Sequence, residues 1–181
     1  MEIICSDKTG TLTLNELTLS TVRPHGNFSE NDLLKMASIA SEESTMDAID
    51  KVIIDKTKEL NIGIPQKTKF IPFDPATKRS ESLYAEDGKS YMAIKGSPLI
   101  IKEFDSSIDW EKESAEFAKR GERTIAVLGG EEGHTPKFYG LLGLSDPVRS
   151  DSRDVIAILK NELNISVRML TQLHHSNLKN S

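Results

Sequence analysis

Short apolar runs and helix-like apolar periods alternate along this sequence. Residues 3–5 form an apolar run bounded by polar residues, and a run of this kind is typical of a strand buried in a sheet. Residues 165–171 form a second such run. Because a long stretch of chain separates the two runs, we expect them to pair in parallel as core strands. Cys5 is the only cysteine of the chain, and we expect it to be a small, buried strand residue.

The chain between these runs mixes helical and strand-like patterns. Ser29 precedes an apolar period and has Asp32 three residues later, which predicts a capped helix start. The dipeptide Asp87-Gly88 separates two strand-like runs and predicts a hairpin. Further helices are expected to begin near residues 44, 98, 110 and 150, and further strands are expected over residues 17–21, 67–73, 82–85, 90–94, 122–127 and 138–144.

The composition is that of an ordinary soluble domain. The 181 residues are 37% hydrophobic and 28% charged, with a net charge of −5. This charge gives no reason to expect nucleic acid or an anionic membrane surface as a partner. No run approaches the roughly 20 apolar residues that span a bilayer, so we do not expect this chain to insert into a membrane. A single cysteine excludes an internal disulfide and fits a cytoplasmic setting.

Asp7 follows the first apolar run, where the predicted strand ends. Ligand chemistry in open α/β sheets gathers beyond the carboxyl ends of strands, and Gly10 allows the backbone to turn closely there. A carboxylate beside Lys8 and backbone N–H groups can attack a phosphoryl group and form an aspartyl phosphate. Such a site needs Mg²⁺ and cationic or N–H donors. A bare pair of this kind is more often a turn cap and a solvated surface charge.

Residues 7–13 read D-K-T-G-T-L-T, which resembles the phosphorylation motif of the P-type ATPases at every position. The resemblance implies that Asp7 accepts the γ-phosphate of ATP, with Lys8 in the same catalytic motif. It also implies that Asp7 and the backbone carbonyl of Thr9 bind Mg²⁺. Related phosphatases of the haloacid-dehalogenase superfamily carry an acid–base aspartate where Thr9 stands, so we expect a phosphoenzyme that persists. Thr171, in M-L-T, matches a hydroxyl that holds the transferred phosphoryl group.

Later segments resemble the nucleotide-binding domain of the same family, most closely its plasma-membrane proton-pump branch. The segment F-D-P-A-T-K-R-S begins at Phe73, which by this resemblance stacks on adenine. Lys78 and Arg79 would supply positive charge to the triphosphate. In K-G-S-P, Lys95 would reach the base or the phosphates, and Gly96 would allow close backbone approach. Taken singly, Phe73 is more often a core aromatic and Lys95 an exposed lysine.

Four other positions complete the implied ATP site. Asp50, in M-D-A-I-D, resembles an acidic residue that faces the adenosine, although the helix dipole also favours a carboxylate in a first helical turn. Arg123 matches a family arginine that contacts the phosphates of ATP; its alternative is a surface arginine where a strand begins. Asp146 and Arg149, in D-P-V-R, match the family hinge and would contact the ribose and phosphates.

The resemblance covers residues 1–171 and implies an α/β fold. This fold is a truncated Rossmann-like parallel sheet of the haloacid-dehalogenase type with an inserted α+β nucleotide-binding domain built on an antiparallel sheet. The expected domains are a partial phosphorylation domain (residues 1–14 and 142–171), a nucleotide-binding domain (residues 15–141) and an unmatched tail (residues 172–181). The family's later motifs, including G-D-G-x-N-D, are missing, so the Mg²⁺ site is expected to be incomplete.

Three functions remain open from the sequence. The first is an ATP-binding catalytic fragment resembling a P-type proton or cation ATPase, unable to transport or turn over alone. The second is an ATP-binding module or sensor that docks on a companion chain carrying the rest of the pump. The third is a soluble haloacid-dehalogenase-type phosphatase, which Thr9 and the missing later motifs disfavour.

Overall fold

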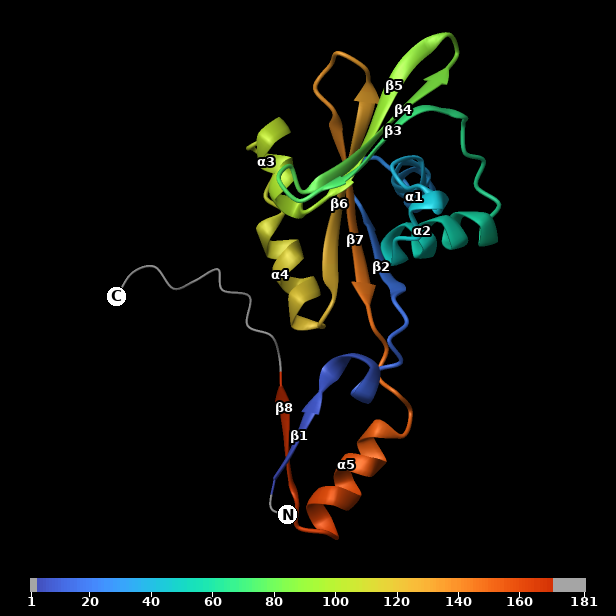
Figure 1. The fold of residues 1–181 in the computed structure, drawn as a ribbon. Helices are drawn as coiled ribbons and strands as arrows, with labels where there is room; N and C mark the ends of the chain where they lie inside the picture. Colours follow the sequence, from blue (N-terminus) through green and yellow to red (C-terminus); the bar gives the residue numbers. More distant parts are fainter. Residues whose placement is uncertain (1–2, 171–181) are drawn as a thin grey trace. The chain divides into compact units, whose positions relative to one another are not determined.

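The computed structural model describes residues 3–170, which form two separate units (Figure 1). The inserted unit is Leu17–Ser145, and the terminal unit combines Met1–Glu16 with Asp146–Ser181. The unit boundaries thus fall at residues 16/17 and 145/146, a few residues from the expected 14/15 and 141/142. Thr171 and the tail at residues 172–181 lie outside the described residues.

The inserted unit is built on a six-stranded antiparallel sheet with the strand order β2-β7-β6-β5-β4-β3. The first and last of these strands along the chain, β2 and β7, pair with each other, from Thr18 opposite Ser145 to Pro24 opposite Gly140. Its strands are β2 (Thr18–Pro24), β3 (Lys67–Asp74), β4 (Arg79–Glu86), β5 (Lys89–Gly96), β6 (Arg123–Glu131) and β7 (Lys137–Ser145), and its α-helices are α1 (Glu30–Ile39), α2 (Ala48–Glu59), α3 (Ile101–Phe104) and α4 (Glu111–Lys119). The mixed α/β fold class and the antiparallel inserted sheet are thereby confirmed.

Local sequence signals account for several of these element boundaries. Ser29 caps α1 in a complete capping box with Asp32, as predicted. Asp87 and Gly88 have φ angles of 51° and 75°, the left-handed values that a two-residue hairpin turn between β4 and β5 requires. Asp47 caps α2 by accepting hydrogen bonds from two backbone N–H groups of its first turn.

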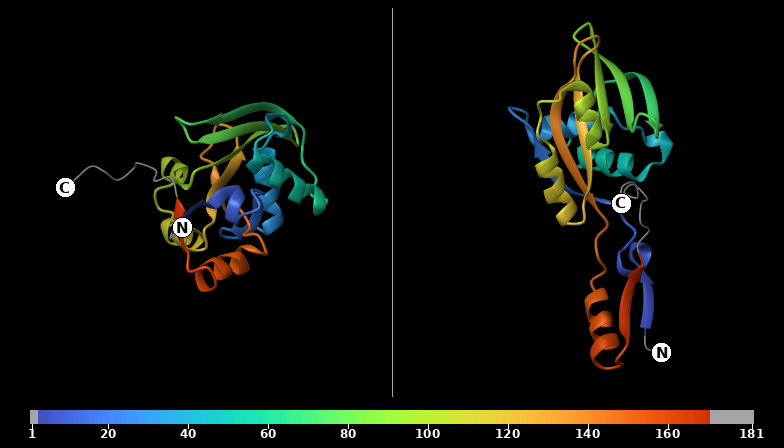
Figure 2. Two further views of the ribbon diagram at one scale, coloured as in Figure 1. Left: turned by 60° about the horizontal axis from the view of Figure 1, so that its bottom comes forward. Right: turned by 90° about the vertical axis from the view of Figure 1, so that its left-hand side faces the viewer.

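Helices cover both faces of the six-stranded sheet (Figures 1 and 2). Helices α1 and α2 pack on one face, where Leu33, Ile39 and Ile53 are fully buried against strand residues such as Val127 and Leu142. Helices α3 and α4 cover the other face in a second cluster, made by Ile94, Ile100, Ile101, Trp110, Phe117, Ala126, Leu128, Phe138 and Leu141. Successive side chains of a strand point to opposite faces, so the central strands β5, β6 and β7 contribute to both cores.

The terminal unit contains a two-stranded parallel sheet, β1 (Ile3–Asp7) and β8 (Ser166–Leu170), with helix α5 (Ser152–Asn161) between them in sequence. Ile3 lies opposite Ser166 and Asp7 opposite Leu170, so the expected parallel pairing of the two chain ends is confirmed. Residues Lys8–Leu12 form a single π-helical turn after β1.

The expectation that Cys5 is buried is wrong, because its side chain is exposed. The strand alternates: Ile4 and Ser6 face a cavity of about 330 Å³ that α5 also lines, whereas Ile3, Cys5 and Asp7 point the other way and are exposed. An apolar run therefore formed a strand whose second face has no cover among the described residues.

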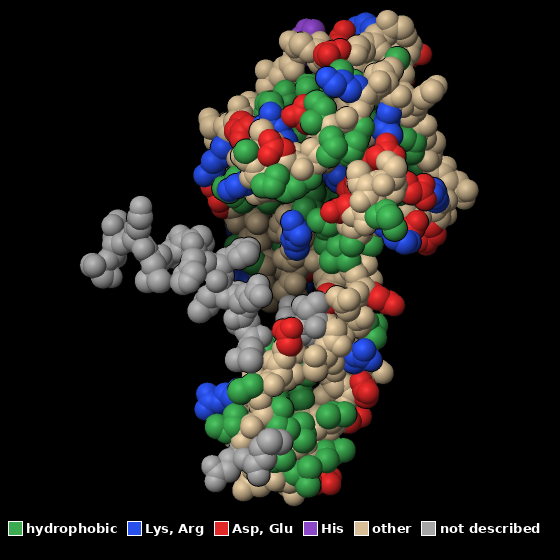
Figure 3. Space-filling model, viewed as in Figure 1, with side chains coloured by type: hydrophobic (Ala, Val, Ile, Leu, Met, Phe, Trp, Pro, Cys, Tyr) green, Lys and Arg blue, Asp and Glu red, His purple; other side chains and the backbone are tan. Residues whose placement is uncertain are grey.

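Several hydrophobic side chains of the terminal unit are exposed on its surface (Figure 3). They are Ile3, Leu14, Val148, Val155, Ile158, Leu163 and Met169. In the part of the chain that the structure describes, no helix has both the length and the apolar character needed to cross a membrane.

Candidate functional site

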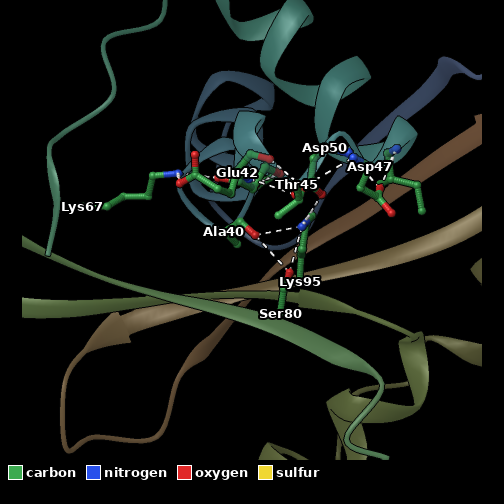
Figure 4. A network of polar contacts seen from close by, with 11 residues as sticks. Ala40, Glu42, Thr45, Asp47, Asp50, Lys67, Ser80 and Lys95 are labelled. Atoms are coloured by element: carbon green, nitrogen blue, oxygen red, sulfur yellow. Dashed lines mark hydrogen bonds and ion pairs between the residues drawn. The ribbon is translucent and has the colours of Figure 1, made fainter. Parts of the chain in front are cut away.

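Lys95 lies near the end of β5, on the sheet face that α1 and α2 cover, and only 6% of the residue is exposed. Its ammonium Nζ lies 2.8 Å from the backbone oxygen of Ala40, 2.8 Å from Ser80 Oγ and 2.7 Å from Asp50 Oδ1 (Figure 4). An ammonium has three N–H donors, so each of them has a protein acceptor. The sequence predicted a lysine that reaches the nucleotide, and the structure places its charged end inside the inserted unit.

Asp50 is the partner of Lys95, and it is 5% exposed in the first turn of α2. While Oδ1 pairs with Lys95, Oδ2 accepts a hydrogen bond from the backbone N–H of Glu42 at 2.9 Å and from Thr45 Oγ1 at 3.4 Å. The carboxylate thus joins the start of α2 to the segment after α1 and to β5. From the sequence, Asp50 and Lys95 were each expected to contact the nucleotide; in the structure they contact each other.

Burial lowers the pKa of Lys95, and the negative charge of Asp50 opposes this shift. Removing two charges from water costs several kcal/mol per ion, and only good geometry with further hydrogen bonds offsets that cost. Here both charged groups have such bonds, from Ala40, Ser80 and Glu42. The ion pair and these hydrogen bonds therefore allow both groups to stay charged while buried. Loss of either partner would leave the other buried without a counter-charge.

A second ion pair lies beside the first. Lys67 Nζ, at the start of β3, is 2.8 Å from Glu42 Oε2 and 2.5 Å from the backbone oxygen of Ser41. The hydrogen bond from Lys67 lowers the pKa of Glu42, against a smaller opposing effect of burial. Two ion pairs, Lys67–Glu42 and Asp50–Lys95, are thus linked through Glu42, whose carboxylate pairs with Lys67 and whose backbone N–H donates to Asp50 (Figure 4).

Sequence reasoning missed Ser80, Glu42 and Lys67 as members of this network. A signal for Ser80 was present: in β4, Ser80, Ser82 and Tyr84 alternate as buried positions, and a polar residue on the inward face of a strand needs a partner. No comparable local pattern marks Glu42 or Lys67, because 24 residues of chain lie between them and the fold alone brings them together.

Gly96 is required by the close approach of the chain around Lys78 and Arg79. A Cβ at Gly96 would lie 2.3 Å from the backbone oxygen of Lys78 and 2.9 Å from Arg79 Cα. That same oxygen accepts a hydrogen bond from Ser97 N at 3.0 Å. Lys78 has a left-handed φ of 57° and an exposed side chain, so the turn before β4 presents a cation at the surface.

Arg79 is on the opposite face of the sheet from Lys95. Its guanidinium pairs with Glu81 at 2.6 Å and with Glu103, and it lies 5.3 Å from the ring centroid of Phe104 on α3. Ser80, the next residue of β4, points toward Lys95, and successive strand residues face opposite sides. The structure thus does not bring the side chain of Arg79 into the Lys95 network.

Phe73 and Arg123 are exposed residues near the same end of the sheet. Phe73 is 53% exposed on β3 and precedes Asp74, which pairs with Arg79, which in turn pairs with Gly96. Arg123 begins β6, three residues before the partner of Gly96 in that strand. Within residues 3–170 no ion pair of the Arg123 side chain is found. An exposed aromatic ring and two exposed cations, Lys78 and Arg123, therefore accompany the buried Asp50–Lys95 pair.

The remaining predicted site residues belong to the terminal unit. Asp7 is exposed at the end of β1, and the turn after it includes Gly10, whose φ is 78°. Asp146 accepts hydrogen bonds from Thr13 Oγ1 at 2.5 Å and from the backbone N–H of Glu16 at 3.2 Å. The Asp146 carboxylate thereby links residues 13–16, where the chain leads into the inserted unit, to residue 146, where the chain leaves it.

Arg149 has an exposed side chain, and its backbone N–H donates to the oxygen of Leu12 at 3.0 Å. Ser152 Oγ donates to the same oxygen at 2.9 Å. These contacts fix the turn after β1 to the start of α5. Lys8 and Thr9 belong to this turn.

The described residues do not by themselves make a magnesium site. Mg²⁺ prefers about six oxygen ligands in octahedral geometry and is usually held by one or two carboxylates with substrate phosphates and water. Asp7 is the last residue of β1 and Thr9 lies in the turn that follows, but residues 3–170 contain no group of three His, Cys, Asp or Glu side chains that could hold a metal ion.

Sequence comparison finds relatives that match almost the whole chain. No protein-family model matches it. A Methanocaldococcus jannaschii protein named as a cation-transporting ATPase is 34% identical over 191 aligned residues, which cover 99% of this chain and 23% of that protein. Plasma membrane ATPase 1 of Saccharomyces cerevisiae is 33% identical, with 94% of this chain and 20% of that protein covered. The chain thus spans about a fifth to a quarter of these relatives' length.

Comparison of structures finds the same fold. A zinc-transporting PIB-type ATPase in its E2.Pi state superposes with a TM-score of 0.66 at 19% identity, covering 93% of this chain and 25% of that one. The catalytic domain of the CPx-ATPase CopB-B superposes with a TM-score of 0.51 at 19% identity, covering 93% of this chain and 52% of that one. At this identity the likeness establishes the fold.

Proposed function

The homologues of this chain are P-type ATPases over almost its whole length, and on that premise we propose that it is an ATP-binding catalytic part of a P-type cation-transporting ATPase. One observation carries the proposal most directly. Exposed Phe73 and Lys78 lie at the end of the sheet where Gly96 permits close packing and where Lys95 is fixed by Asp50. Ion transport is proposed only for the longer proteins of which this chain matches about a fifth to a quarter. We propose that this part lies on the cytoplasmic side of a membrane.

In this proposal the exposed groups contact ATP and the buried pair shapes the wall behind them. Phe73 offers a π-face on which adenine stacks. Lys78 and Arg123 offer positive charge to the phosphates. Lys95 and Asp50 fix the positions of β5 and α2, because all three N–H donors of Lys95 are already used by protein acceptors.

Asp7 is the proposed phosphoryl acceptor. A carboxylate oxygen of Asp7 would form a bond to the γ-phosphorus while the bond between that phosphorus and the bridging oxygen of ADP breaks, giving an aspartyl phosphate and ADP. Its exposed position at the carboxyl end of a parallel strand supports this role. Completion of the charge balance falls to groups beyond those described, such as a companion chain would supply.

A simpler function, ATP binding without phosphoryl transfer, has its own support. The inserted unit has two packed cores and a continuous six-stranded sheet of its own, so nucleotide binding there would not depend on the chemistry of Asp7. Such a module would sense ATP or dock on a companion chain. The two functions share the binding site and differ in whether Asp7 becomes labelled.

A calorimetric titration of the full chain with Mg-ATP tests the proposal. We expect binding in the micromolar to millimolar range and a loss of about 1–3 kcal/mol of binding free energy in Phe73→Ala, because base–aromatic stacking has that value. Leu60→Ala is the control, since Leu60 is 44% exposed in the same unit at the end of α2. No binding to the folded chain, or equal loss in both variants, would contradict the proposed site.

A further inference from the structure

Glu42 connects the two ion pairs of the Lys95 network through different parts of one residue. Its backbone N–H donates to Asp50 Oδ2 at 2.9 Å, and its side-chain Oε2 pairs with Lys67 Nζ at 2.8 Å. Glu42 stands in extended backbone conformation between α1 and a short 3₁₀ turn, Glu43–Thr45. The direction of its N–H is therefore set by contacts of this connecting segment and not by a regular helix.

Lys67 holds this segment from the edge of the sheet. Its ammonium bonds both Ser41 O at 2.5 Å and Glu42 Oε2 at 2.8 Å, and it lies 5.5 Å from the ring centroid of Phe70. The side chain of Lys67 is 23% exposed and that of Glu42 29%, so water screens this pair less than a fully exposed one. Lys67 thus fixes two consecutive residues, Ser41 and Glu42, and the backbone N–H of Glu42 is the group that donates to Asp50.

We infer that Glu42 and Lys67 form a positioning pair for the proposed nucleotide site: they aim the Glu42 N–H at Asp50 and so hold the Asp50–Lys95 pair in register. The inference rests on the proposed function for its effect on ATP. Neither residue touches the nucleotide in this role. Lys67 also balances the negative charge of Glu42, so among residues 3–170 the positive charge of Lys95 pairs with Asp50 alone.

A neighbouring ion pair provides a matched control. Lys58 pairs with Glu43 at 3.0 Å, with side chains 60% and 70% exposed. It involves the residue next to Glu42, yet neither member bonds Asp50 or Lys95 among the contacts found. Lys58→Met removes a lysine charge from the same region as Lys67→Met without releasing the Glu42 N–H.

The experiment measures two quantities on the full chain in Lys67→Met, Lys67→Arg and Lys58→Met. The first is amide hydrogen exchange at Glu42, which reports the Asp50 bond without any ligand. The second is the dissociation constant for Mg-ATP. We expect about tenfold faster exchange at Glu42 and about tenfold weaker ATP binding in Lys67→Met. We expect near wild-type values in Lys58→Met, and recovery in Lys67→Arg because arginine can bond both acceptors.

The outcomes separate this inference from the proposed function. If exchange at Glu42 is unchanged in Lys67→Met, the positioning pair is wrong whether or not ATP binds. If exchange rises but ATP affinity stays the same, the pair does not serve the nucleotide site and the inference fails. If the wild-type chain binds no ATP while exchange at Glu42 still rises selectively in Lys67→Met, the proposed function fails and only the local aiming of Asp50 stands. A urea unfolding curve for each variant shows that the fold is retained.

Discussion

The two units of this protein differ in how they present their proposed functional residues. In the inserted unit the ion pair of Lys95 and Asp50 is buried, with both residues less than 7% exposed, and helices cover both sheet faces. In the terminal unit Asp7 is exposed on a two-stranded sheet. The proposed binding wall therefore depends on a packed interior, whereas the proposed nucleophile depends on a strand end and a turn. Substitutions in the two units should separate binding and stability from chemistry.

The largest expected effect is that of Asp50→Ala. It leaves the Lys95 ammonium buried without its counter-charge, and breaking a buried ion pair by removing one partner costs about 3–5 kcal/mol. Urea unfolding monitored by circular dichroism measures the loss. Asp55→Ala is the control, because Asp55 pairs with Lys51 at the surface of the same helix and such a pair contributes at most about 1 kcal/mol. Equal effects of both changes would show that the Asp50 pair is not a buried one.

Gly96→Ala should destabilise the inserted unit by about 1–3 kcal/mol, the usual cost of overpacking. The added Cβ would meet the backbone oxygen of Lys78 at 2.3 Å, and backbone cannot move aside as a flexible side chain does. Gly63→Ala meets nothing within 4 Å and serves as the matched change. A midpoint shift in urea for Gly63→Ala as large as that for Gly96→Ala would refute the close approach at β5.

Features that depend on residues close together in the sequence could be predicted from it, and features that depend on contacts between distant segments could not. The Ser29 capping box and the Asp87-Gly88 turn were correct because each depends on residues a few positions apart. The parallel pairing of β1 with β8 followed from two apolar runs with a long connection. Local patterns decide such elements before any packing is known.

Other features depend on which distant segments meet. The exposure of Cys5 depends on α5 covering only the other face of β1, and an apolar run does not carry that information. The Glu42–Lys67 pair joins a loop to an edge strand. Arg79 looked like a partner of Lys78 in the phosphate site, but strand alternation turned it toward Glu103. These outcomes arise from long-range packing.

A smaller effect is expected from the pH dependence of Glu42. Because the hydrogen bond from Lys67 holds its folded-state pKa below the ordinary value of 4.5, the unfolded chain binds a proton more readily. The stability contributed by this pair is therefore present above about pH 4.5 and is lost as pH falls through the lower folded pKa. As the pH is lowered from 7 to 3, the unfolding free energy of Glu42→Gln should therefore fall less than that of the wild-type chain. The expected difference between the two decreases is about 0.2–1 kcal/mol. Parallel curves for both proteins would contradict the shift.

The smallest effect on stability is expected from Asp7→Asn. Asp7 is exposed on β1, and surface substitutions usually stay within about 0.5 kcal/mol. ATP affinity should also be unchanged, because the proposed wall lies in the inserted unit. Incubation with γ-labelled ATP, together with whatever completes the site, should label the wild-type chain and not the variant. Label retained by Asp7→Asn would place the acceptor elsewhere.

The central claim is that the inserted unit builds the ATP site. Residues 17–145, expressed alone, test it most directly by calorimetric titration with Mg-ATP beside the full chain. We predict a folded unit that binds ATP within about tenfold of the full chain, with affinity lowered again by Phe73→Ala. A folded unit that binds no ATP under conditions in which the full chain does would contradict the claim and assign the site to residues of the terminal unit.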